Sequence, residues 1–315
     1  MNHTRNIYNK YSDYLKNKHG EKVYKLPINL PITCPNRIHA GGCTFCSEVG
    51  TGFEAMDATC SVVEQLTTTK DYIASRYHAK KFIAYFQNFT NTFMSLALFE
   101  QRMIEACQVE DIVELSISTR PDCINRDYLE VLKKVQADYH VDITIELGLQ
   151  TTNCHTLAYI ERGHSLAEFI DAVMQIKPYG FTICTHVILN LPNDTLLDAK
   201  ECAKVLSALR VDIVKVHSLY IAKHTKMSTQ FLANEFEICT KEEYLKRLVC
   251  FVEYLSPDII IERLFSRIPK EEMEFSNWNT SWWKLQDEFI ALMEAGNTYQ
   301  GKNFQYLNGA ALHKL

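Results

Sequence analysis

Residues 34–46 read CPNRIHAGGCTFC and place three cysteines, Cys34, Cys43 and Cys46, on one loop. An apolar run of strand length, residues 23–32, directly precedes this loop. Several glycines lie in and just after the loop, and glycine lets a backbone turn closely, so the three thiols can converge on one point. The stretch therefore predicts a cysteine site at the end of a strand.

Three interpretations of the cysteine site compete. Ordinary core thiols are one, since free cysteine is among the most buried residue types, although a CxxC pair in a loop argues against it. Zinc is the second, with His39 or Cys60 as a fourth ligand, but structural zinc usually binds two close pairs of ligands. An iron–sulfur cluster is the third. With three cysteines, one iron lacks a protein ligand and is open to a substrate.

Strand-length apolar runs alternate with segments of helical period along the whole chain. Strands are expected at residues 23–32, 81–87, 111–118, 141–149, 180–189, 211–219 and 258–264. Helices are expected at residues 60–77, 95–107, 126–137, 152–160, 165–177, 195–209 and 241–255. Asn125 and Asp194 stand where helix N-caps are wanted. The alternation predicts an α/β fold, a full or partial (β/α) barrel, whose chemistry lies at the C-terminal strand ends.

Composition and charge are those of a globular protein. The 315 residues are 47% hydrophobic and 23% charged, and the formal net charge of −5 gives no global basic field for nucleic acid. Residues 1–26 nevertheless hold six basic against two acidic side chains. We expect a basic N-terminal segment over 1–26, a barrel over 27–265, and a helical, aromatic capping segment over 266–315.

The same composition bears on location. No run approaches 18 apolar residues, so no membrane span and no membrane partner is expected. The N-terminus lacks the apolar region of a signal peptide, and eleven cysteines without an export signal predict reduced thiols in the cytoplasm.

Motifs on successive strands carry a resemblance to a known family. The cysteine loop is followed by TRPD (119–122), ELGLQT (146–151) and RGH (162–164). Together they resemble the radical S-adenosylmethionine (SAM) superfamily, in its Elongator-catalytic-subunit-like branch. Further stretches resemble a short bacterial family of YhcC/YtqA type: YFQNFTNT (85–92), STRPDC (118–123), VKVHSLYIAKHTKM (214–227) and NTYQGK (297–302).

The resemblance implies a cofactor chemistry. Cys34, Cys43 and Cys46 would ligate a [4Fe–4S] cluster whose open iron binds SAM. Reduction by a flavodoxin or ferredoxin-type electron donor would cleave SAM and release a 5′-deoxyadenosyl radical, which abstracts a hydrogen atom from the substrate.

The resemblance also implies a set of SAM contacts: Phe45, Gln87, Ser118, Glu146, Gln150, Arg162 and His186. Ser118 stands where relatives usually carry an acid, and LPND (191–194) stands where a glycine-rich turn is usual. Glu146 lies within an apolar strand, so it must either pair with a cation or face the site. Strand alternation puts Glu146 and Gln150 on one face.

The same branch implies a substrate, the C5 side chain of the wobble uridine in tRNA, with conversion of a carboxymethylaminomethyl to an aminomethyl group. The basic residues of 1–26 and those of 223–226 could follow phosphates. Two alternatives stay open: a radical SAM enzyme for a small metabolite or peptide, and a non-catalytic binding module stapled by zinc.

Overall fold

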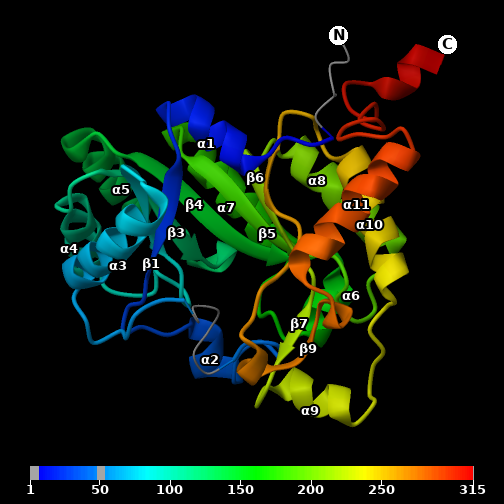
Figure 1. The fold of residues 1–315 in the computed structure, drawn as a ribbon, viewed down its shortest axis with the longest axis horizontal. Coiled ribbons are helices and arrows are strands. Elements are labelled where there is room, and N and C mark those ends of the chain that lie inside the picture. The colour runs from blue at the N-terminus through cyan, green and yellow to red at the C-terminus, as the bar shows by residue number, and fades with distance from the viewer. Residues whose placement is uncertain (1–6, 48–53, 315) are drawn as a thin grey trace. The chain divides into compact units, whose positions relative to one another are not determined.

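The computed structural model describes residues 7–47 and 54–314, and parallel strands alternate with helices along it (Figure 1). The strands of the main sheet follow the order β1-β2-β3-β4-β5-β6-β8. They are β1 (Val23–Ile28), β2 (Lys81–Phe86), β3 (Ile112–Thr119), β4 (Asp142–Gln150), β5 (Thr182–Ile188), β6 (Ile213–His217) and β8 (Ile260–Arg263). Within the described residues β1 and β8 end this order. The predicted α/β fold is therefore confirmed, in the partial form of the barrel.

All seven expected helices form: α3 (Val62–Tyr77), α4 (Leu96–Cys107), α5 (Arg126–Tyr139), α6 (Cys154–Tyr159), α7 (Leu166–Ile176), α8 (Leu196–Ala208) and α10 (Lys241–Tyr254). Three helices and two strands were not predicted: α1 (Tyr11–His19), α2 (Pro35–Ala40), α9 (Lys226–Leu232) and the antiparallel pair of β7 (Tyr220–Ala222) with β9 (Met273–Ser276). In α1 a single side chain, Leu15, is buried. A helix this short and polar has no apolar period to detect.

The chain divides into two compact units. The N-terminal unit comprises Ser12–Leu149 and Ile160–Thr185, and the C-terminal unit comprises Met1–Tyr11, Gln150–Tyr159 and His186–Leu315. These units do not test the expected boundaries 1–26, 27–265 and 266–315, which stay a prediction.

In the N-terminal unit, helices α3, α4 and α5 lie side by side over the strands (Figure 1). Helix α3 packs on β1 and α4 packs on β3. Each helix buries an apolar stripe, including Leu66, Phe99 and Leu129, which are at most 1% exposed. All of β2 beyond Lys81 is buried, as a parallel strand covered on both faces requires.

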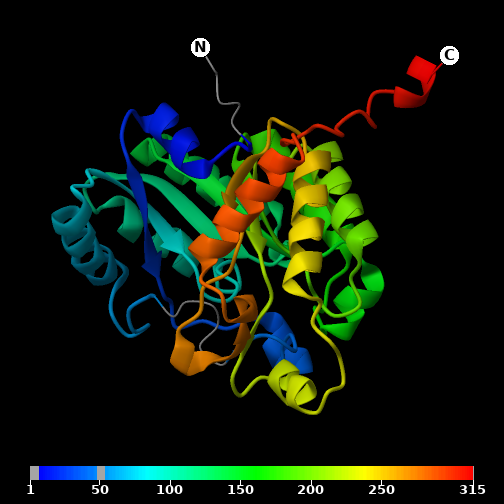
Figure 2. The same cartoon turned by 45° about the vertical axis from the view of Figure 1, so that its right-hand side comes forward.

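In the C-terminal unit, α8 and α10 pack side by side, and α11 (Trp282–Ala295) contacts α10 (Figure 2). The NTYQGK stretch (297–302) packs against the segment that follows α10. The buried Gln300 amide donates to the carbonyls of Ser256 and Ile259, both at 2.7 Å. Gly301 has φ +79°, and a Cβ there would lie 2.8 Å from Pro257. The motif therefore ties the segment after α11 to residues 256–259.

No helix of the described residues is long and apolar enough to cross a membrane.

Of the two predicted helix N-caps, one is confirmed and one is wrong. Asn125 caps α5, since its side chain accepts from the backbone N–H of Tyr128 at 3.2 Å. The expected cap at Asp194 is wrong, because Thr195 caps α8 in a reciprocal capping box with Asp198. Asp194 is buried instead and accepts a 2.6 Å bond from the Thr156 hydroxyl. Burial raises the pKa of this carboxyl to about 6.

The cap can be tested directly. Thr195→Ala removes the hydroxyl that accepts from the N–H of Leu197, so we expect the free energy of unfolding to fall by about 1 kcal/mol. Thr195→Ser keeps a hydroxyl and is the matched control. Urea denaturation of both variants measures the difference, and an equal loss in the serine variant would contradict the cap assignment.

Candidate active site

The cysteine loop is shaped by a six-residue helix between its first two cysteines. Cys34 is the extended N-cap of α2, with Pro35 in the first turn. Gly41 ends the helix in the left-handed region, at φ 78°, and its N–H bonds to the Asn36 carbonyl. Cys43 follows this turn, and the N–H of Cys46 donates to the Cys43 carbonyl at 3.0 Å. The part of the expected loop that holds Gly50 and Gly52 lies outside the described residues.

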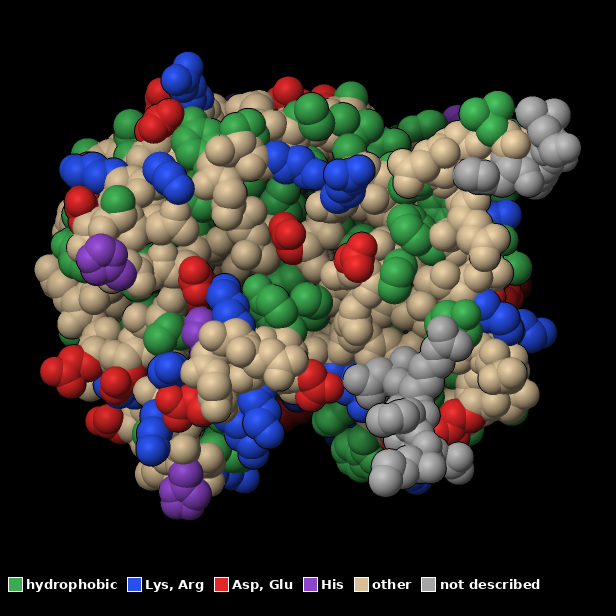
Figure 3. Space-filling view, turned by 90° about the horizontal axis from the view of Figure 1, so that it is seen from above, with side chains coloured by type: hydrophobic (Ala, Val, Ile, Leu, Met, Phe, Trp, Pro, Cys, Tyr) green, Lys and Arg blue, Asp and Glu red, His purple; other side chains and the backbone are tan. Residues whose placement is uncertain are grey.

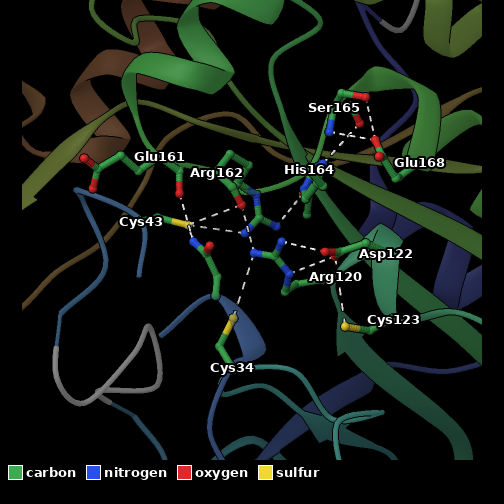
Figure 4. Close-up of polar contacts among 12 residues, drawn as sticks. Cys34, Cys43, Arg120, Asp122, Cys123, Glu161, Arg162, His164, Ser165 and Glu168 are labelled. Carbon is green, nitrogen blue, oxygen red and sulfur yellow. Dashed lines mark hydrogen bonds and ion pairs between the residues drawn. The ribbon is translucent and has the colours of Figure 1, made fainter. Parts of the chain in front are cut away.

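Each of the three thiols faces a guanidinium N–H donor, and Figure 4 shows the donors beside Cys34 and Cys43. Arg120 Nη1 lies 3.9 Å from the sulfur of Cys34. Arg162 Nη1 lies 3.5 Å from the sulfur of Cys43. For Cys46 the donor is a nitrogen of Arg37, also at 3.5 Å. A guanidinium N–H beside each sulfur can donate a charge-assisted hydrogen bond to it.

Asn36 and Arg37 come from the short helix itself. The Asn36 amide donates to the carbonyl of Glu161 at 2.8 Å and lies 3.5 Å from the sulfur of Cys43. Arg37 stacks over the Phe89 ring, 5.1 Å from its centroid. Burial raises the pKa of the Cys46 thiol, and Arg37 opposes that shift. A guanidinium held in this way compensates a buried thiolate.

The donor set fits an iron–sulfur cluster better than a single zinc ion. A tetrahedral zinc with Zn–S bonds of about 2.3 Å needs its sulfurs about 3.8 Å apart. Two groups of three His, Cys, Asp or Glu side chains among the described residues bring their ligand atoms within 4.8 Å of one another, and the three cysteines are not one of them. His39, one suggested fourth zinc ligand, is exposed on α2. Sulfurs set further apart suit a cluster that spans several irons.

The loop after β2 is held by a network of side-chain hydrogen bonds. The Asn91 amide donates to the carbonyls of Phe86, Asn88 and Ser118 at 2.9 to 3.1 Å. The Asn88 amide donates to the Asn29 side chain at 2.8 Å. Three buried oxygens here have no hydrogen-bond partner among the described residues: Asn88 Oδ1, Thr90 Oγ1 and Asn91 Oδ1. Buried polar atoms normally have partners, so this loop suits a polar ligand.

Gln87 and Ser118 flank this hydrogen-bond network. The N–H of Gln87 continues the ladder by donating to the Ile28 carbonyl at 3.2 Å. The Ser118 hydroxyl donates to the Tyr85 hydroxyl at 3.3 Å. Phe45 is half-buried between the last two cysteines. The structure thus brings Gln87, Ser118 and Phe45 into the N-terminal unit together with the cysteine loop.

Glu146 meets the requirement of a buried acid by pairing with a cation. Its carboxylate accepts from Lys25 Nζ at 2.6 Å and from the Ser116 hydroxyl at 2.7 Å, and its side chain is fully buried. Lys25 also lies over the Tyr85 ring, 4.8 Å from the centroid. The pair shows how the strand tolerates Glu146, and a role for Glu146 in SAM binding stays a prediction.

The RGH segment closes on the β4 backbone. The Arg162 side chain donates to the Gly148 carbonyl at 2.6 Å, and His164 Nε2 lies 3.2 Å from the same oxygen. Arg162 is buried, and its Nε has no hydrogen-bond partner among the described residues. Burial lowers the pKa of His164 to about 4, with the charge of Arg162 acting in the same direction. His164 is therefore neutral at pH 7.

Two predicted SAM contacts lie in the C-terminal unit. Gln150 ends β4 in the left-handed region, at φ 79°. The His186 ring stacks on the His217 ring, with centroids 5.4 Å apart.

Sequence reasoning missed Asn36, Arg37 and Arg120 as neighbours of the sulfurs. Asn36 and Arg37 stand inside the cysteine loop, and Arg120 stands in TRPD. For Arg37 and Arg120, the available signal was a basic residue within a motif already singled out.

Comparisons with known proteins identify the family. The Radical SAM superfamily model matches residues 28–206, and the Radical_SAM C-terminal domain model matches residues 211–295. YtqA of Bacillus subtilis (strain 168) is 30% identical over 307 residues, 96% of this chain and 95% of that protein. YhcC of Escherichia coli (strain K12) is 29% identical over 280 residues, 88% of this chain and 89% of that protein. This chain belongs to the radical SAM superfamily.

Two further similarities concern the Elongator-like branch. A tRNA uridine(34) acetyltransferase of Methanocaldococcus jannaschii is 23% identical over 164 residues, 51% of this chain and 29% of that protein. The solved structure of Methanocaldococcus infernus Elp3 has a TM-score of 0.68 at 17% identity, and covers 88% of this chain and 64% of that chain. The fold is shared with Elp3. The expected cofactors, a [4Fe–4S] cluster and SAM, are confirmed as those of the family.

The Lys25–Glu146 pair gives a stability prediction. Lys25→Met leaves Glu146 as a buried charge without its ammonium partner at 2.6 Å, so we expect a loss of about 3–5 kcal/mol in the free energy of unfolding. Adding Glu146→Gln should restore part of that loss. Urea denaturation measures both.

Lys70→Met is the matched control. Lys70 also lies over a ring and pairs with Asp111 at 2.8 Å, but that carboxylate is 51% exposed. We expect a loss of less than about 1 kcal/mol. Equal losses at Lys25 and Lys70 would show that the burial of Glu146 does not matter.

Proposed function

We propose that Cys34, Cys43 and Cys46 hold the [4Fe–4S] cluster and that the chain is a radical SAM enzyme acting on the C5 side chain of the wobble uridine in tRNA. One observation carries the cluster assignment: three sulfurs from one loop, each beside a guanidinium N–H at 3.5 to 3.9 Å. When bound, the cluster and SAM supply the one-electron cleavage that yields a 5′-deoxyadenosyl radical.

The chain's own residues bind and orient these groups. Arg162 is held against the Gly148 carbonyl with its Nε still to be satisfied, which suits contact with a carboxylate. The unsatisfied oxygens after β2 suit the donors of an amino group or a ribose. The proposed SAM contacts are Phe45, Gln87, Ser118, Glu146, Gln150, Arg162 and His186. A flavodoxin or ferredoxin-type protein would deliver the electron.

Support for a tRNA substrate comes mainly from relatives. The M. jannaschii relative is named for uridine 34 of tRNA, and the Elp3 structure shares the fold. We propose the same nucleoside here, with a carboxymethylaminomethyl group converted to an aminomethyl group.

The surface offers a modest electrostatic contribution to RNA binding. In the basic segment, Lys18 pairs with Asp142 at 2.9 Å and Lys25 pairs with Glu146. Lys10, Lys16 and Lys22 are exposed. Basic and acidic side chains are interspersed on the face drawn in Figure 3. A small basic footprint of this kind predicts weak, salt-sensitive contact with phosphates.

The cluster assignment is tested by single substitutions. Cys34→Ala, Cys43→Ala and Cys46→Ala should each abolish the formation of 5′-deoxyadenosine from SAM under dithionite, because each removes one ligand. Iron and sulfide content of anaerobically purified protein are measured alongside. Cys107→Ala, at a half-buried thiol outside the site, is the matched control and should keep full cleavage. Full cleavage by Cys43→Ala would overturn the assignment, and zinc in place of iron would favour the binding module.

The substrate is tested with the wild-type protein. The rate of 5′-deoxyadenosine formation is measured without RNA, with tRNA from cells lacking this protein, and with the same tRNA digested to nucleosides. We expect intact tRNA alone to raise the rate, and mass spectrometry of the treated tRNA to show loss of the carboxymethyl group. Equal rates in all three samples would favour a small metabolite or a peptide.

A further inference from the structure

Arg120 occupies a fixed position between the cysteine loop and the RGH segment. It follows β3 and is 3% exposed. Asp122 holds it in a two-pronged pair, with Nε to Oδ1 and Nη2 to Oδ2 both at 2.8 Å. This pair leaves Nη1 free to serve other acceptors. Nη1 donates to the Arg162 carbonyl at 2.9 Å and lies 3.9 Å from the Cys34 sulfur (Figure 4).

The backbone around Arg162 is shaped to admit this contact. Gly163 has φ +75°, and a Cβ there would lie 2.3 Å from the Asn36 side-chain oxygen and 3.3 Å from Arg120 Nη2. The N–H of Thr44 donates to the Ile160 carbonyl at 3.0 Å. The cysteine loop, the end of β3 and the RGH segment therefore meet with no room for a side chain at residue 163.

The contact has an electrostatic consequence. Hydrogen bonds and positive charge near cluster sulfurs favour the reduced state, because reduction adds a negative charge. Arg120 provides both beside Cys34. Asp122 sets a negative charge against it at 2.8 Å and weakens its field.

We propose that Arg120 is a positioning residue that fixes Cys34 against the Arg162 carbonyl and raises the reduction potential of the cluster, and that Asp122 limits this rise. This inference rests on the proposed function, because it needs a cluster at the three cysteines. The pair thereby sets how readily the site accepts an electron.

The experiment uses the full chain, purified and reconstituted without oxygen. Arg120→Gln, Arg120→Lys and Asp122→Asn are compared with wild type for iron per chain and for reduction potential, by electron paramagnetic resonance during redox titration. Arg102→Gln is the control for the loss of an ion-paired arginine outside the site, because Arg102 pairs with Glu105 at 2.7 Å on α4.

We expect Arg120→Gln to keep its iron and to lower the reduced-to-oxidised ratio at a given potential at least tenfold, which for one electron is 59 mV. Arg120→Lys keeps the charge and should recover part of that shift. Asp122→Asn should shift the potential in the opposite direction, and Arg102→Gln should not shift it.

The outcomes separate the two proposals. A wild-type protein without iron would refute the cluster itself. Iron in all proteins, with the same potential in Arg120→Gln and Asp122→Asn as in wild type, would overturn the role of Arg120 alone. If Arg120→Gln binds no iron, the potential of Asp122→Asn decides, and an unshifted value there overturns the role of Arg120.

Discussion

The meeting of three sulfurs with three guanidinium groups is the contact on which the rest of the site depends. Cys34, Cys43 and Cys46 come from one loop, whereas two of the guanidinium groups come from far along the chain. Thiolates gathered in a partly buried place repel one another and lose hydration. Arginine offsets the repulsion because it stays charged, and it replaces the lost hydration because it carries five N–H donors.

The sheet supplies the rigidity that this contact needs. Parallel strands end on one edge, so the loops after β1, β2 and β3 meet there. Hydrogen bonds hold these loops in place: the backbone N–H of Thr44 donates to the Ile160 carbonyl, and the Asn91 side-chain amide donates to the Ser118 carbonyl. Within the sheet, Lys25 on β1 pairs with Glu146 on β4, so that the charge of this buried acid is compensated. Loops held by hydrogen bonds of this kind keep their geometry when reduction adds a negative charge to the site.

Family and site point to the same chemistry by separate routes. Family membership follows from sequence similarity over most of the chain. The cluster proposal follows from the three sulfurs of one loop and the guanidinium donor beside each of them. The substrate depends on relatives more than on the surface, since two lysines of the basic segment serve internal ion pairs.

The alternation of strands and helices, the α/β class and the three cysteines could be predicted from the sequence alone, because apolar period and residue spacing are local properties. The sequence did not reveal α1 or α9, because each is short and buries only one or two side chains, too few for an apolar period. It also missed the guanidinium neighbours. Arg120 and Cys34 are separated by 86 positions. Only the pairing of β1, β2 and β3 in register brings them together, and contacts of that kind leave no local pattern.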